Sequence, residues 1–159
     1  MTRKLNNQHG LTVIEFTIVA TVLLIILFAI FEIAVFVYSL QTLNDISRRS
    51  ARIATVCVVN DSEIKTLVFS EWTPKDFTAD NIEINYLDED GDVIVDPVAG
   101  HINIRYVRAR VINYDYGFSG ALGFLSDNGV ITVPDFQTTL PAESLGVLRV
   151  DDPDAKTDC

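Results

Sequence analysis

The chain has 159 residues, a net charge of −10 and a mean hydropathy of +0.26. This length corresponds to about one domain, and the acidic surplus argues against a nucleic-acid partner because binding phosphates needs clustered Lys and Arg. Only two His and two Cys are present, too few to favour a catalytic triad or a zinc site. We therefore expect no enzyme activity, no cofactor and no resident metal.

The charge is divided unevenly along the chain. Residues 1–57 hold five Lys or Arg against three Asp or Glu, whereas residues 58–159 hold seven against nineteen. Such an asymmetry indicates two different environments, with a nearly neutral first part and a strongly acidic second part.

An apolar run covers residues 16–38 and contains Glu32 as its single charge. As a helix, these 23 residues extend over about 34 Å, enough to cross a hydrocarbon core of about 30 Å. The run is longer than the apolar region of a secretory signal peptide and has no small-residue cleavage site before Gln41. It therefore predicts a transmembrane helix.

The helical pattern continues beyond the apolar run. Gly and Pro are absent from Leu11 to Cys57, and the apolar residues after Gln41 fall near one face. We predict one long helix over residues 11–57, spanning the membrane at about residues 16–38. Its N-terminus lies in the cytoplasm, and the acidic part lies outside because long domains translocate largely regardless of charge.

Residues 58–159 are expected to form a β-rich head outside the cytoplasm. Short apolar runs separated by turn residues predict antiparallel strands, and residues 58–75 add a short helix or a loop. The predicted fold class is α+β, with the C-terminal half of the long helix covering one face of the sheet. The expected strands cover residues 82–87, 92–95, 102–114 and 130–133.

Two local features of the head are predicted in detail. The Asp-Glu-Asp-Gly sequence at 88–91 indicates a hairpin turn, because Gly supplies the positive φ that tight turns need. Within 102–114 the apolar positions change phase near Tyr106 and Val107, which predicts a β-bulge there.

The acidic turn also suggests a cation site. Asp88, Asp90 and Asp92 would supply the oxygen ligands that Ca²⁺ prefers, but their spacing is not that of an EF-hand loop. A solvated acidic turn is the favoured interpretation, with calcium as the weaker alternative.

The two cysteines stand at the end of the predicted helix and at residue 159. Outside the cytoplasm, a disulfide between Cys57 and Cys159 is favoured and would join the tail to the helix. Two free thiols, with Cys57 buried, are the alternative.

A short basic leader precedes the helix, and it ends in Gly10, after which come Leu11 and an acidic residue, Glu15. This pattern resembles the processing site of type IV pilin-like precursors. The resemblance implies that a prepilin peptidase removes residues 1–10 and leaves Leu11 as the new N-terminus.

A carboxylate inside a membrane helix is costly and needs a partner. Cleavage after Gly10 creates one, the α-amino group of Leu11, either in the same chain or in a neighbouring subunit. The alternative for Glu15 is a side chain that reaches to water at the interface. Glu32 lies deeper and either faces a partner helix or lies near the outer interface.

The stretch from Gly10 to Ala54 resembles the N-terminal region of TadE-like proteins of Tad pilus assembly. The resemblance rests on Gly10, on Glu15 with Phe16, on Glu32 at the outer end of the span, and on the arginines from Arg48 to Arg52. It implies a minor pilin or pseudopilin that assembles, or primes assembly, through its N-terminal helix. The implied partners are the membrane, the prepilin peptidase, other pilin subunits and the assembly platform. The implied location is the bacterial inner membrane with a periplasmic head, and then the cell-surface pilus.

A non-polymerising, membrane-anchored binding module of adhesin-like character is the second function that fits the sequence. Its candidate contacts are Trp72 and a glycine-rich stretch that contains Phe118 and Phe124. A packed loop is the favoured interpretation of that stretch.

Overall fold

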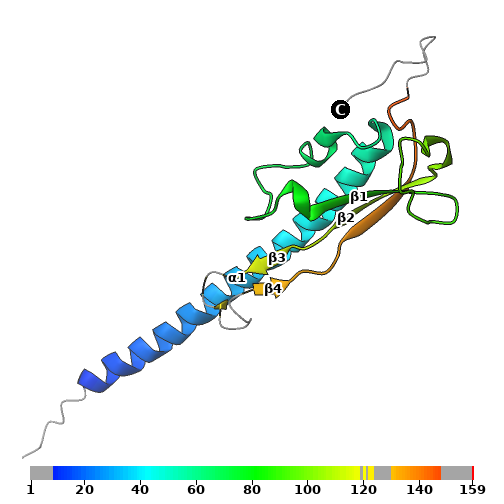
Figure 1. Ribbon diagram of the computed structural model, residues 1–159. Helices are drawn as coiled ribbons and strands as arrows, with labels where there is room; N and C mark the ends of the chain where they lie inside the picture. Colours follow the sequence, from blue (N-terminus) through cyan, green and yellow to red (C-terminus); the bar gives the residue numbers. More distant parts are fainter. Residues whose placement is uncertain (1–8, 119, 121, 124–129, 148–158) are drawn as a thin grey trace, which may run out of the picture. The chain divides into compact units, whose positions relative to one another are not determined.

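The structure, a computed structural model, describes residues 9–118, 120, 122–123, 130–147 and 159. It divides into two compact units. The helix unit consists of residues 1–37 with 116–131, and the sheet unit consists of residues 38–115 with 132–159. A single long helix contributes its N-terminal part to the first unit and its C-terminal part to the second (Figure 1).

Helix α1 runs without interruption from His9 to Val56 (48 residues). It contains no proline, and its one glycine, Gly10, lies in the first turn, so nothing in its interior favours a break. The long N-terminal helix and the α+β class that the sequence predicts are both confirmed.

The sheet unit contains a three-stranded antiparallel sheet in the order β1-β2-β5. Ile84 of β1 lies opposite Ala109 of β2, and Arg108 of β2 lies opposite Thr139 of β5. Strand β3 pairs with β4 in a separate two-stranded sheet (Figure 1). The strands are β1 (Ile82–Leu87), β2 (Tyr106–Val111), β3 (Asp115–Gly117), β4 (Val130–Thr132) and β5 (Gln137–Pro141), and three short 3-10 helices cover Ser62–Lys65, Ala79–Asn81 and His101–Asn103.

The C-terminal part of α1 packs through small side chains. Ser47, Ser50, Ala51 and Ala54 are all nearly or fully buried, and small residues allow a helix to approach a sheet closely. The Ser47 hydroxyl also lies 3.2 Å from the Thr138 hydroxyl of β5. The core around Ala54 further contains Cys57, Val59, Ile64, Tyr86, Ile104, Val107 and Leu145. The helix therefore covers one face of the sheet, as predicted.

A distant segment caps the C-terminus of α1. The last carbonyl groups of a helix have no partner within it. Here the Thr55 carbonyl accepts the backbone N–H of Leu145 (3.1 Å), and the Val56 carbonyl accepts that of Gly146 (2.8 Å). The Ser144 hydroxyl also donates to the Val56 carbonyl (3.1 Å). This cap requires the chain at Gly146 to pass directly over Val58.

We expect Gly146→Ala to destabilise the sheet unit by at least about 2 kcal/mol. Gly146 has φ +81°, and an added Cβ would lie 2.7 Å from the Val58 Cα and 2.8 Å from its backbone nitrogen. Gly91→Ala is the matched control, because Gly91 has φ +86° but open space around its Cβ position. That variant should lose only about 1 kcal/mol from backbone strain. Chemical denaturation of both variants measures the difference, and equal losses would contradict the role given to the contact with Val58.

The predicted strand at 92–95 is wrong, although the turn before it is confirmed. Gly91 has positive φ, and the Asp88 N–H donates to the Asp92 carbonyl (3.0 Å). Pairing then stops after a single bridge between Leu87 and Val93. The reason is that the Asp96 carboxylate bonds the N–H groups of Val98 and Ala99, which turns the chain away from the sheet.

The long strand predicted at 102–114 is wrong at both ends, since β2 covers only Tyr106–Val111, and the predicted bulge is also wrong. Residues 101–103 form a 3-10 turn, and β2 begins only at Tyr106. From there the register with β1 is continuous. The change of phase near Tyr106 therefore marks the junction between a turn, in which Ile102 is 80% exposed, and a regular strand.

Candidate functional site

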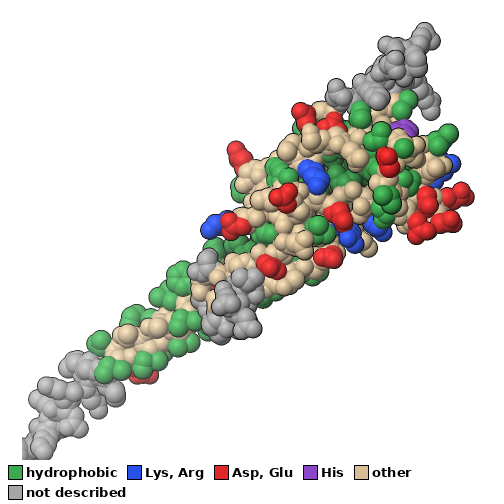
Figure 2. Space-filling view, in the orientation of Figure 1, with side chains coloured by type: hydrophobic (Ala, Val, Ile, Leu, Met, Phe, Trp, Pro, Cys, Tyr) green, Lys and Arg blue, Asp and Glu red, His purple; other side chains and the backbone are tan. Residues whose placement is uncertain are grey.

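The N-terminal part of α1 presents an apolar surface that the protein itself does not bury. Its most apolar stretch is not buried by any other described part of the chain. Figure 2 shows hydrophobic side chains covering this part of the helix. Among the described residues, α1 is the one helix long and apolar enough to cross a membrane, judged by length and composition. A surface of this size is normally covered by lipid or by other protein chains.

The predicted processing site lies at the start of α1. Because the helix begins at His9, Gly10 and Leu11 fall in its first turn. Gly is the least favourable helix residue after Pro. Cleavage between Gly10 and Leu11 stays a prediction.

Glu15 and Phe16 are exposed on the next turn, and Phe16 is 74% exposed. The neighbouring polar groups are satisfied locally, since the hydroxyls of Thr17 and Thr21 donate to the carbonyls of Val13 and Thr17. By contrast, no hydrogen bond or ion pair of the Glu15 carboxylate is found within the described part of the chain. The two predictions for Glu15, a partner from outside that part or water at the interface, both stay open.

Glu32 has hydrogen-bond partners within the chain, which the sequence does not predict, and the two alternatives for its position stay predictions. Its Oε1 accepts the backbone N–H of Gly120 (2.6 Å), and its Oε2 accepts that of Leu122 (2.7 Å). Hydrogen bonds to a charged acceptor are about twice as strong as neutral ones. The carboxylate thus holds a loop 88 residues away in sequence against α1. We call this pair of bonds the Glu32 clamp.

Aromatic side chains continue this contact one turn above the clamp. The Phe36 ring lies 5.0 Å from the Tyr116 ring and 5.4 Å from the Phe118 ring, and Tyr116 contacts Phe118 at 5.2 Å. Phe118 therefore belongs to a packed loop, as favoured from the sequence, while Phe124 lies outside the described residues. Beside the clamp is a cavity of about 450 Å³ lined by Ile25, Phe28, Phe31, Glu32, Val35, Tyr116 and Gly120.

We expect Gly120→Ala to break the Glu32 clamp. An added Cβ would lie 2.8 Å from the Glu32 Oε1, which displaces the carboxylate from both N–H groups. The loss should be about 1.5–3 kcal/mol in the helix unit, the usual contribution of hydrogen bonds to a charged group. Gly123→Ala is the control, because its Cβ meets only the Phe118 carbonyl at 3.6 Å. Faster amide hydrogen exchange at Leu122 in Gly120→Ala alone is the expected result, and equal exchange in both variants would contradict the clamp.

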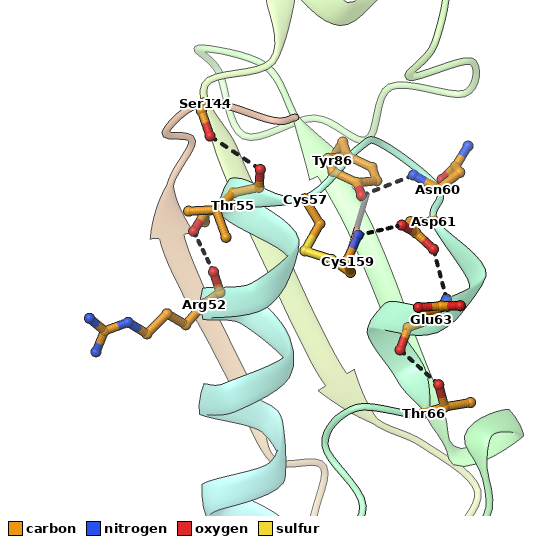
Figure 3. The surroundings of a disulfide bond; sticks show 11 residues. Arg52, Thr55, Cys57, Asn60, Asp61, Glu63, Thr66, Tyr86, Ser144 and Cys159 are labelled. Atoms are coloured by element: carbon orange, nitrogen blue, oxygen red, sulfur yellow. Dashed lines mark hydrogen bonds between the residues drawn. A yellow bond between two sulfur atoms is a disulfide. The ribbon is translucent and has the colours of Figure 1, made fainter. Parts of the chain in front are cut away.

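Cys57 and Cys159 are joined by a disulfide with a Cα–Cα distance of 5.6 Å, within the normal range (Figure 3). Cys57 is 6% exposed and belongs to the core. The Cys159 N–H donates to the Asp61 Oδ2 (3.1 Å), and the Tyr86 hydroxyl accepts the Asn60 N–H (3.2 Å). Burial raises the pKa of Tyr86. The bridge is thus surrounded by bonds that hold the chain after α1.

Asp61 should make this region sensitive to acid. Its carboxylate accepts the N–H groups of Glu63 and Cys159, and these bonds lower its pKa below the ordinary 3.8. Because the folded pKa is the lower one, the stabilisation is complete above about pH 4 and is lost as pH falls through the folded value. We expect wild type to be more stable than Asp61→Asn at pH 7, with the difference shrinking as pH falls below about 4. A constant difference down to pH 2 would contradict this assignment.

The acidic turn uses its carboxylates on its own backbone. The Asp88 Oδ1 accepts the N–H groups of Asp90 (3.0 Å) and Asp92 (2.9 Å). Within the described ranges, no group of three or more His, Cys, Asp or Glu side chains is placed to hold a metal ion. The calcium alternative therefore gains no support from the geometry.

The architecture places the chain in a general class of proteins, those in which one long apolar helix precedes a small α+β unit. More specifically, residues 10–52 match the family model described as TadE-like protein. The chain thus carries a TadE-like domain, consistent with a pilin-like protein associated with the Tad pilus. No curated protein and no solved structure matched the chain.

Proposed function

We propose that this chain is a minor pilin or pseudopilin of a Tad-type pilus. A prepilin peptidase cuts between Gly10 and Leu11, residues 11–57 form the membrane and assembly helix, and residues 58–159 form the periplasmic head. The observation that carries the proposal is an exposed apolar helix, within a TadE-like domain, on which Glu15 has no partner among the described residues. Other pilin subunits and the assembly platform are the proposed partners.

In this proposal the apolar surface of α1 is covered first by lipid and then by other subunits. Before assembly its exposed residues face lipid, and after assembly they face the helices of other subunits. Glu15 then pairs with the α-amino group of Leu11, which is charged and becomes available only after cleavage. TadE-like proteins are generally non-enzymatic, and we propose the same of this chain.

The intact mass of the protein, extracted from cells with and without a prepilin peptidase, tests the proposal. Loss of residues 1–10 only in the presence of the peptidase is the expected result. Gly10→Val should block cleavage because it adds a branched side chain at the cut, whereas Gly91→Ala, far along the sequence, should be processed normally. An unprocessed wild-type chain in both strains would overturn the proposal.

An anchored binding module is the second candidate function. It is favoured by apolar side chains exposed on the sheet unit, namely Trp72 (68%), Val95 (98%) and Ile102 (80%). Under this function the leader is retained and the chain is absent from sheared pili. The mass measurement and a pilus-shearing assay therefore separate the two functions.

A further inference from the structure

The Glu32 clamp bears on where the membrane ends along α1. The apolar run in the sequence extends to Tyr38, which would place Glu32 and Phe36 inside the hydrocarbon region. The structure, however, puts irregular chain and a two-stranded sheet at the level of these residues. Lipid-exposed loops and open sheet edges do not occur within the hydrocarbon region, because their backbone groups find no partners there.

We propose that the outer boundary of the membrane lies at Glu32, so that residues 11–31 span it and the clamped loop rests on the lipid headgroups. This inference rests on the proposed function, because it needs the chain to be inserted in a membrane. Compared with the span of residues 16–38 predicted from the sequence, the inner end lies five residues nearer the N-terminus and the outer end seven residues nearer.

The length of the helix fits this placement. The 21 residues from Leu11 to Phe31 extend over about 31 Å, close to the 30 Å of a hydrocarbon core. Glu15 then lies about 6 Å inside the inner boundary, within reach of the Leu11 amine. Thr21 becomes the midpoint of the span, whereas Leu27 is the midpoint of residues 16–38.

The side chains around the clamp have the character of a membrane interface. Phe28 (64% exposed) and Phe31 (73% exposed) point outward just below Glu32, and Tyr116 lies just above it. Aromatic residues are enriched at this level of membrane proteins. On the membrane side of Glu32, Ile25 and Phe28 form an apolar wall of the adjacent cavity, of the kind that lipid tails fill.

One apolar residue beyond Glu32, Phe36, packs within the chain, whereas Ile33, Val35, Val37 and Tyr38 remain about half exposed. Phe36 is partly buried under Tyr116 and Phe118. Its hydrophobicity is therefore explained by packing within the chain and does not require contact with lipid tails. The two carboxylate oxygens of Glu32 meanwhile satisfy backbone N–H groups of the loop, which lowers the cost of placing that loop near lipid.

Tryptophan fluorescence in vesicles tests the boundary directly. Trp72 is the single native Trp, so Trp72→Phe gives a silent background for Thr21→Trp, Leu27→Trp and Phe118→Trp in the full chain. The vesicles contain phosphatidylcholine brominated either at mid-chain depth or near the headgroups. We expect the deep bromines to quench Thr21→Trp about twofold more than Leu27→Trp, and the shallow bromines to quench Phe118→Trp.

Stronger deep quenching of Leu27→Trp, or quenching of Phe118→Trp by aqueous iodide and by no brominated lipid, would overturn the inference. If Phe118→Trp misfolds, the comparison of Thr21→Trp with Leu27→Trp still tests the position of the boundary. Adding Gly120→Ala to Phe118→Trp should reduce the shallow quenching, while Gly123→Ala should not. Flotation with the vesicles and processing by the peptidase are measured in parallel, since their failure would instead contradict the proposed function.

Discussion

Replacing Cys159 with Ser is expected to lower the free energy of unfolding of the sheet unit by about 2–5 kcal/mol. The bridge joins residues 102 apart in sequence, and the chain-entropy model assigns about 4.7 kcal/mol to a loop of this size. Cys57 directly follows α1 and lies in the core, so the bridge ties residue 159 to that core. The Cys159 N–H bond to Asp61 should also be weakened in the variant.

Guanidinium denaturation followed by circular dichroism measures this loss. Reductant is the internal control, because wild type and Cys159→Ser should unfold at the same concentration once the bridge is reduced. The variant leaves Cys57 in place, and the new hydroxyl lies at residue 159, which is only partly buried at the edge of the core. Equal unfolding midpoints without reductant would contradict a bridge that stabilises the sheet unit.

The sequence predicts the elements whose signals are local. The absence of Gly and Pro after Gly10 allowed the long helix α1 to be predicted, and Gly91 allowed the turn after β1 to be predicted. Strand β5 was not predicted, because its alternation of exposed and half-buried residues, QTTLP, contains a single large apolar side chain. Its place depends on partners far along the chain, the backbone of β2 and the hydroxyl of Ser47.

The same limit applies to the candidate site. The sequence singles out Glu32 because a carboxylate in an apolar run is costly, but it cannot identify a backbone partner 88 residues away. The residue types in the sequence do not identify such a partner, because every residue except Pro has a backbone N–H group. The one available signal was the glycine-rich stretch around Gly117, Gly120 and Gly123, where backbone can approach a side chain closely.

The second large effect is expected at Glu15. We predict that Glu15→Ala leaves the chain membrane-inserted and processed, but lowers its incorporation into the pilus about 100-fold. Removing one partner of a buried ion pair costs about 3–5 kcal/mol, because the other charge is left unpaired in a low-dielectric environment. A loss of about 3 kcal/mol corresponds to roughly a hundredfold change in an equilibrium constant. The unpaired charge in this case is the α-amino group of Leu11.

Immunoblots of sheared pili and of membranes measure the ratio of incorporated to inserted protein. Asp45→Ala is the matched control, since it also removes an acidic side chain from α1 but only breaks an exposed ion pair with Arg49. Glu32→Ala distinguishes the role of Glu32 from that of Glu15. The partners of Glu32 lie within the chain, so this variant should leave the Leu11 amine paired. Normal incorporation of Glu15→Ala would mean that the amine finds its partner elsewhere, and the apolar surface of α1 alone would then have to specify assembly.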